Sequence, residues 1–130
     1  MRRWKNMLII DANAILRYTL NDNIDMAKTV NELIGKHKVT IRYEVMAEVV
    51  YVLEKMYKLS RNEVRDGLKA FLALPNVETE TKSVLLLALE TYADKNLDFV
   101  DCLLYAYKAL HGYDVFTFDK KLNNLLNTVV

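Results

Sequence analysis

Short aliphatic runs alternate along the chain with longer segments in which apolar residues recur at helical spacing. Apolar runs of this length that stop at polar residues are typical of buried strands. They predict strands at Met7–Ile10, Val39–Ile41 and Val115–Phe118. Two further stretches, Asn76–Glu78 and Thr128–Val130, are interpreted as an edge strand and a final strand.

The amphipathic segments between these runs predict helices, and several have recognisable ends. Ser60 and Glu63 have the spacing of a capping box at the start of one helix, which Pro75 ends. Gly35 is expected to end another helix as its C-cap. The predicted helices follow Asp11 and cover residues 25–34, 43–57, 61–74, 82–94 and 98–112, and Asp119 opens the last one.

This alternation of strands and helices indicates the fold class. Strands joined through helices imply right-handed crossovers and a parallel sheet with both faces covered. We therefore predict an α/β fold, a three-layer α/β/α domain with a central parallel sheet of four or five short strands. No linker, repeat or low-complexity stretch interrupts the chain, so residues 1–130 are expected to form a single domain. In such sheets the functional crevice lies beyond the carboxyl ends of the strands.

The composition excludes several kinds of site. The 3 Gly are too widely spaced for a G-x-G-x-x-G turn or a Walker loop. With 1 Cys and 2 His, the chain cannot build a zinc site from these ligands alone. The net charge of +1 lacks the basic excess of proteins that coat nucleic acid, so a role on RNA or DNA requires a local site.

No targeting or membrane segment is visible in the sequence. The longest apolar run, Val84–Leu89, is far shorter than the roughly 20 residues that span a bilayer. A single thiol, Cys102, cannot form a disulfide within the chain and points weakly to a reducing compartment. We therefore expect a cytoplasmic protein without membrane association.

Four acidic residues stand where a parallel sheet places its chemistry. Asp11 and Asp119 directly follow predicted strands, Asp101 lies in the first turn of a predicted helix, and Glu48 borders the apolar face of another. Taken singly, each has an ordinary interpretation: a turn residue, a helix cap, a dipole partner or a solvated flank. Four acids at one crevice would repel one another unless a divalent cation were present, and Mg²⁺ or Mn²⁺ prefers oxygen ligands. The corresponding chemistry is metal-assisted hydrolysis of a phosphodiester.

Four blocks of the chain stand out together: Leu8–Tyr18, Glu48–Glu54, Leu97–Leu104 and Val115–Lys121. In sequence and in order they resemble PIN-domain ribonucleases, especially VapC-type toxins. The resemblance implies a PIN fold, dependence on Mg²⁺ or Mn²⁺, endoribonuclease activity, a homodimer and inhibition by a cognate antitoxin. An excess of apolar surface on the helices around 26–34 and 51–57 also favours association.

The positions of this chain that match the family's motifs indicate its site residues. The resemblance assigns Asp11, Glu48, Asp101 and Asp119 to the acidic quartet that holds the metal and performs catalysis. It assigns Asn13 and Thr117 to supporting positions, while Asp98 is either a further acid or only a helix cap. Ala12 departs from the pattern, because a small hydroxyl residue is common there. Three cations flank the site motifs: Arg17, Lys120 and Lys121. They either contact RNA phosphates or are simply solvated.

Two alternatives belong to other functional classes. A PIN-like scaffold would bind RNA or a protein partner without cleaving it, and the complete set of acids argues against this interpretation. An aspartate-based phosphoryl-transfer enzyme is the second alternative. It is disfavoured because Asp11-Ala12-Asn13 lacks the second acid of such sites, and it would act on a small phosphate ester instead of RNA.

Overall fold

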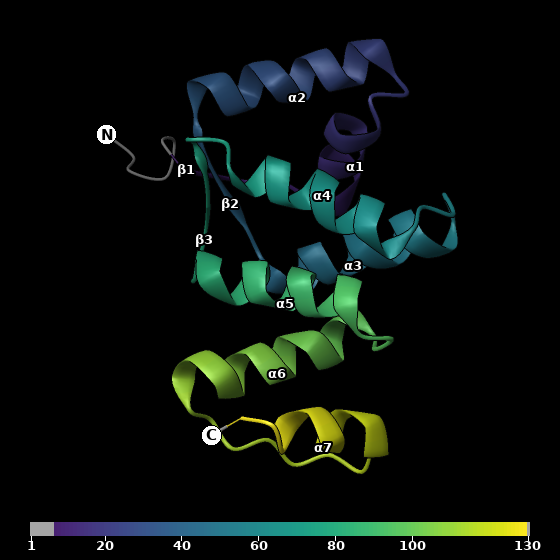
Figure 1. Ribbon diagram of the computed structural model, residues 1–130. Helices are drawn as coiled ribbons and strands as arrows, with labels where there is room; N and C mark the ends of the chain where they lie inside the picture. The colour runs from purple at the N-terminus through teal and green to yellow at the C-terminus, as the bar shows by residue number, and fades with distance from the viewer. Residues whose placement is uncertain (1–6, 130) are drawn as a thin grey trace. The chain divides into compact units, whose positions relative to one another are not determined.

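The computed structural model describes residues 7–129, which form three strands and seven helices (Figure 1). The chain divides into two compact units, residues 1–80 and 81–130. The first unit contains β1 (Met7–Ile9), α1 (Ala12–Leu20), α2 (Ile24–Lys36), β2 (Lys38–Ile41), α3 (Tyr43–Lys55), α4 (Arg61–Leu72) and β3 (Val77–Thr79). The second unit contains α5 (Lys82–Asp94), α6 (Phe99–His111) and α7 (Lys120–Leu126).

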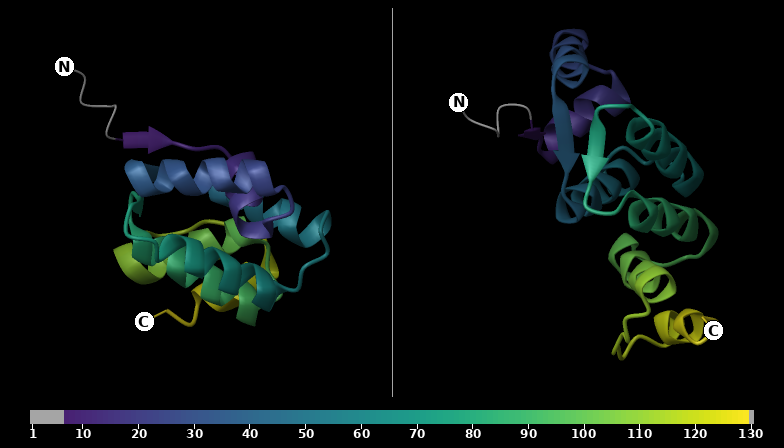
Figure 2. Two further views of the ribbon diagram at one scale, coloured as in Figure 1. Left: turned by 90° about the horizontal axis from the view of Figure 1, so that it is seen from above. Right: turned by 90° about the vertical axis from the view of Figure 1, so that its left-hand side faces the viewer.

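The first unit is built on a parallel sheet with the strand order β1-β2-β3 (Figure 2). Leu8 pairs with Val39, which pairs with Val77 on the other side. Val39, Ile41 and Val77 are buried, and the Thr79 hydroxyl donates a hydrogen bond of 2.7 Å to the Ile41 carbonyl. The parallel α/β architecture and the strands predicted at Met7–Ile10, Val39–Ile41 and Asn76–Glu78 are therefore confirmed, and β3 is an edge strand as expected.

The strand predicted at Val115–Phe118 is not formed. These residues are irregular backbone between α6 and α7, and the side chains of Phe116 and Phe118 are 83% and 91% exposed. A strand requires a hydrogen-bonding partner, and residues 81–129 contain no other strand that would supply one. Of the predicted final strand, Thr128 and Val129 follow α7 as turn and irregular backbone, and Val130 lies outside the described residues. The sheet of residues 7–129 thus has three strands instead of the four or five expected.

The two faces of the sheet differ. Val39 and Val77 lie on a buried face, whereas Met7 and Ile9 point to the opposite face and are exposed, Ile9 by 64%. Within residues 7–80, the predicted covering of both faces by helices is therefore not confirmed, because the outer face of β1 is open.

Helix α1 is central to the first unit, since it packs against α2, α3 and α4. Its buried side chains are Ala12, Ile15 and Leu16. The Tyr18 ring meets the Phe71 ring of α4 edge to face, with centroids 5.3 Å apart. A Cβ atom at Gly67 of α4 would lie 3.3 Å from Cγ2 of Thr19, so a side chain larger than hydrogen would crowd this approach. The helix that follows Asp11 is thus fixed on several sides.

The predicted and observed ends of the helices agree at some positions and differ at others. The capping box of Ser60 and Glu63 is present at the start of α4, as predicted. Gly35, by contrast, does not end α2, which continues to Lys36 and has the extended residue His37 as its C-cap. The chain passes directly from there into β2, so no left-handed residue is needed. Gly112 does take the left-handed conformation, with φ of 72°, at the end of α6.

The second unit is helical. Helix α6 packs against both α5 and α7, and lies between them in Figure 1. Buried residues from all three helices, among them Leu89, Cys102 and Leu122, form its core, and Tyr92 meets Phe99 edge to face at 6.2 Å. In the part of the chain that is described, no helix has the length and apolar character needed to cross a membrane.

Candidate functional site

Asp11 caps helix α1 just after the first strand. Strand β1 ends at Ile9, the buried Ile10 follows, and Asp11 takes an extended conformation as N-cap. One of its carboxylate oxygens accepts a hydrogen bond of 2.9 Å from the backbone N–H of Ala14. The other oxygen has no hydrogen-bond partner among residues 7–129, so an exposed acceptor remains beside the end of the strand. Asp11 is therefore a helix cap and not merely the turn residue of its ordinary interpretation, and one of its oxygens remains available to a ligand.

An open pocket of about 300 Å³, here called the α1–α2 pocket, lies next to Asp11. It combines two carboxylates, an amide and a guanidinium with apolar side chains. Asp11, Asn13 and Arg17 are among the residues predicted from the sequence, whereas the residues that α2 contributes are not. No sequence signal marks them, because only the packing of α1 on α2 brings them together. The pocket is lined by Asp11, Asn13, Ala14 and Arg17 of the α1 region and by Asp25, Met26, Thr29 and Val30 of α2.

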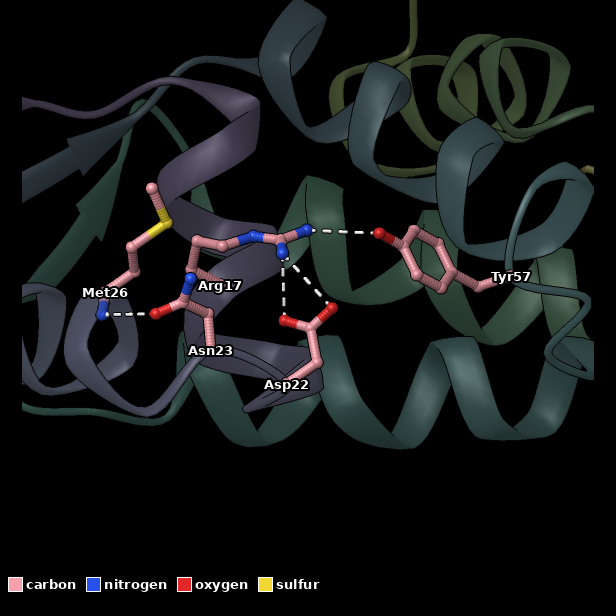
Figure 3. A network of polar contacts seen from close by, with 5 residues as sticks. All are labelled: Arg17, Asp22, Asn23, Met26 and Tyr57. Carbon is pink, nitrogen blue, oxygen red and sulfur yellow. Dashed lines mark hydrogen bonds and ion pairs between the residues drawn. The ribbon is translucent and has the colours of Figure 1, made fainter.

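Arg17 is engaged in a network of its own (Figure 3). Its Nη1 donates to both carboxylate oxygens of Asp22, at 2.9 and 3.1 Å, and its Nη2 donates to the hydroxyl of Tyr57 at 3.2 Å. The hydrogen bond to the Tyr57 hydroxyl and the charge of Asp22 raise the pKa of Arg17 against the opposing effect of burial. The side chain is 16% exposed. Arg17 is therefore held in place by protein groups and is not a mobile, solvated cation.

Glu48 lies on α3 and is exposed. Its neighbour Val49 is fully buried, so the carboxylate stands at the edge of the apolar face, as the sequence predicted. Within residues 7–129 its side chain makes no hydrogen bond or ion pair. Glu48 and Asp11 both belong to the first unit, and the remaining predicted acids belong to the second.

The second unit brings three of the predicted acids close together. Asp98 is the N-cap residue of α6 by position, but its side chain makes no capping hydrogen bond. Asp101 follows in the first turn and is half-buried. Burial raises the pKa of Asp101, and the negative charges of Asp119 and Asp98 raise it further. Asp98 therefore acts electrostatically on Asp101 instead of satisfying the end of the helix.

Asp119 is held at the start of α7. One carboxylate oxygen accepts a hydrogen bond of 2.7 Å from the backbone N–H of Leu122. The backbone N–H of Asp119 donates to the hydroxyl of Thr117 at 3.0 Å, and the side-chain amide of Asn123 donates to the Thr117 carbonyl at 2.9 Å. Thr117 thus fixes the backbone of Asp119. Asn123 is not among the residues predicted from the sequence.

The two lysines after Asp119 differ from each other. The Lys121 ammonium donates to the backbone carbonyl of Asn96, within the second unit. Lys120 is exposed and has no ion pair or hydrogen bond to its side chain among the described residues. Of the three cations predicted to contact phosphates, Lys120 is therefore the one whose side chain makes no hydrogen bond or ion pair within residues 7–129.

The donor set suits a hard divalent cation. The oxygens of Asp98, Asp101 and Asp119 are ligands of the kind that Mg²⁺ and Mn²⁺ prefer, and their mutual repulsion is what a bound cation relieves. No group of three or more His, Cys, Asp or Glu side chains within residues 7–129 is already arranged to hold a metal ion. The chemistry of the donors therefore fits a metal, while a finished coordination shell is not formed.

Comparison with known proteins identifies the family. The model of the PIN domain matches residues 8–125, which is most of the chain. No curated protein and no solved structure matches the sequence. PIN domains are mostly metal-dependent ribonucleases and generally bind divalent metal. Since the match covers residues 8–125 of 130, the chain belongs to the PIN domain family.

Proposed function

We propose that this protein is a metal-dependent endoribonuclease that hydrolyses phosphodiester bonds in RNA. The observation that carries this proposal is the group of three carboxylates in the second unit, where burial and then the charges of Asp119 and Asp98 raise the pKa of Asp101. Carboxylates that repel one another lower the stability of a fold. Clusters of this kind are frequent at functional sites. Membership of the PIN domain family supports the same reaction.

We propose that the reaction uses the carboxylates of Asp11, Glu48, Asp101 and Asp119, with Mg²⁺ or Mn²⁺ as cofactor. When bound, the cation supplies a Lewis acid and an activated water molecule. Asp11 and Asp119 are held by the backbone N–H groups that they cap, so each presents a carboxylate at low entropic cost. The supporting residues are Asn13, Thr117 and Asp98.

The proposed RNA contacts follow from the state of each cation. Lys120 is exposed and lies next to Asp119, so it is the cation proposed to attract phosphates. Lys121 and Arg17 are engaged with protein groups, and their proposed part is to hold the backbone and the pocket near the reactive acids.

We further propose that the protein is the toxin of a toxin–antitoxin pair, active in the cytoplasm, and forms a homodimer. Exposed apolar side chains of the first unit support association with another protein surface, since Tyr51, Met56 and Ile24 are 61%, 70% and 78% exposed. Sedimentation at micromolar concentration tests the dimer. A single species of 15.1 kDa would contradict it.

The test of the activity is cleavage of RNA by the purified protein. Total RNA is incubated with Mg²⁺ or Mn²⁺, and then with EDTA in place of the metal. We expect cleavage only with metal, and none for Asp11→Asn under either condition. Fragments that form equally in EDTA would contradict the metal mechanism. Binding of RNA without any cleavage would instead favour a PIN-like scaffold.

A further inference from the structure

We propose that the α1–α2 pocket binds an unpaired guanine base of the RNA substrate and gives the enzyme a preference for guanine beside the cleaved bond. The position relative to the cleaved bond rests on the proposed ribonuclease function, whereas the recognition of the base rests on the pocket alone. The pocket belongs entirely to the first unit. Five observations carry this proposal: its size, its apolar lining, its free polar groups, its fixed cation and its contact with Asp11.

The size and the lining suit one flat aromatic ring system. A volume of about 300 Å³ is at the small end of the range for ligand sites. Ala14, Met26 and Val30 supply apolar surface, and Val30 is buried between the helices. Single-stranded RNA presents unstacked bases that proteins take into such sites.

The free polar groups select the base. Asp25 and Asn13 line the pocket, and neither side chain has a hydrogen-bond partner among residues 7–129. An ionised carboxylate only accepts hydrogen bonds. Guanine offers two adjacent donors, N1–H and the 2-amino group, that match the two oxygens of Asp25. In the other three bases each Watson–Crick donor has at least one acceptor beside it, which would face the same carboxylate. Asp25 therefore favours guanine.

The cation of the pocket is pre-oriented. Asp22 and Tyr57 fix the guanidinium of Arg17 through three hydrogen bonds (Figure 3). Planar guanidinium groups stack on nucleobases, and a fixed one loses little entropy when it does so.

Asp11 connects this pocket to the proposed reaction. It lines the pocket and is one of the acids proposed to act on the phosphodiester. A base held by Asp25 would therefore belong to a nucleotide next to the bond that is cleaved. The substrate class is single-stranded RNA that contains guanine at this position.

The binding test uses guanosine and inosine monophosphates, which differ only in the 2-amino group of the base. Each is titrated into the metal-free protein in EDTA and followed by chemical shifts in NMR spectra. We expect the guanine nucleotide to bind more tightly, on the order of tenfold, because inosine loses one half of a bidentate contact. Equal affinities for the two nucleotides would overturn the proposal.

Variants assign the preference to the pocket. Asp25→Asn and Asp25→Ser are expected to bind both nucleotides equally, and melting curves check that each variant is folded. The matched control is Glu32→Gln, since Glu32 is an exposed acid of the same helix that does not line the pocket. The control should keep the preference. Retention of the preference in both folded Asp25 variants would overturn the assignment.

Mapping of cleavage sites separates this inference from the proposed function. Metal-dependent cleavage without enrichment of guanine at any position would overturn the pocket's role and leave the ribonuclease function standing. A guanine preference that depends on Asp25, in a protein that cleaves no RNA, would support the base pocket and contradict the ribonuclease function. Enrichment of guanine that disappears in Asp25→Asn supports both.

Discussion

The guanidinium of Arg17 and the hydroxyl of Tyr57 are joined by a hydrogen bond of 3.2 Å across 40 positions of sequence. Arg17 lies on α1, and Tyr57 follows the end of α3. The same guanidinium pairs with Asp22 in the turn between α1 and α2. One side chain therefore ties together three segments that border the α1–α2 pocket or support it.

Tyr57→Phe is expected to lower the free energy of unfolding by about 0.5–1 kcal/mol, because one partly exposed hydrogen bond is lost and the ring remains. Urea denaturation of parent and variant measures this difference. The matched control is Tyr51→Phe, an exposed tyrosine on α3, which should change stability by less than the measurement error. Equal effects of the two substitutions would show that the hydrogen bond to Arg17 contributes nothing.

Thr19→Val is expected to stabilise the protein by about 1 kcal/mol. The hydroxyl oxygen of Thr19 is buried and has no hydrogen-bond partner among residues 7–129. Folding therefore removes it from water without a replacing hydrogen bond, which lowers the stability of the folded state. Valine has nearly the same shape and keeps the methyl group that approaches Gly67. Thermal melts of both proteins measure the change. A destabilised Thr19→Val variant would mean that the hydroxyl does find a partner.

The capping box of α4 predicts a pH dependence. Hydrogen bonds from the backbone and the hydroxyl of Ser60 lower the pKa of Glu63 below its ordinary 4.5. Because the folded pKa is the lower one, Glu63 contributes stability above the ordinary pKa, and this contribution is lost as the pH falls through the folded value. Glu63→Gln should therefore be less stable than the parent at neutral pH, and the difference should vanish in acid. A difference that is independent of pH would contradict this assignment.

Asp119→Asn is expected to leave the metal-free protein as stable as the parent or more stable. The substitution removes one of the charges that raise the pKa of Asp101, while asparagine keeps an oxygen for the N–H of Leu122. The gain should be greatest at neutral pH and shrink in acid, where Asp101 is protonated. Melts in EDTA test this, with Asp119→Ala as the comparison, because alanine loses the cap at a cost of about 1 kcal/mol.

Local signals in the sequence were reliable where the structure depends on neighbours along the chain. The capping box of Ser60, the cap at Asp119 and the bounds of α5 follow from short-range hydrogen bonds and apolar spacing. The segment Val115–Phe118 has the composition of a strand, yet a strand exists only with a partner, which composition does not reveal.

The candidate site shows the same division. Asp11, Asp101 and Asp119 were predictable because they follow apolar runs or begin helices. Asp25 and Met26 were not, since they face the pocket only because α2 packs on α1. The attachment of Arg17 to Asp22 and Tyr57 was equally hidden, because an arginine beside a motif is compatible with a phosphate contact or a structural tie.

Binding of a divalent cation by the acids should show itself as stabilisation of the folded protein by Mn²⁺. At about 100 times the dissociation constant, a bound ion should raise the free energy of unfolding by roughly 2.7 kcal/mol. Thermal melts with Mn²⁺ and with EDTA compare the parent with Asp101→Asn and with Asp114→Asn, a control at an exposed acid of the same unit. We expect a metal-induced shift in the parent and in the control that is largely lost in Asp101→Asn. A parent that melts identically in Mn²⁺ and EDTA, or a full shift in Asp101→Asn, would contradict this expectation.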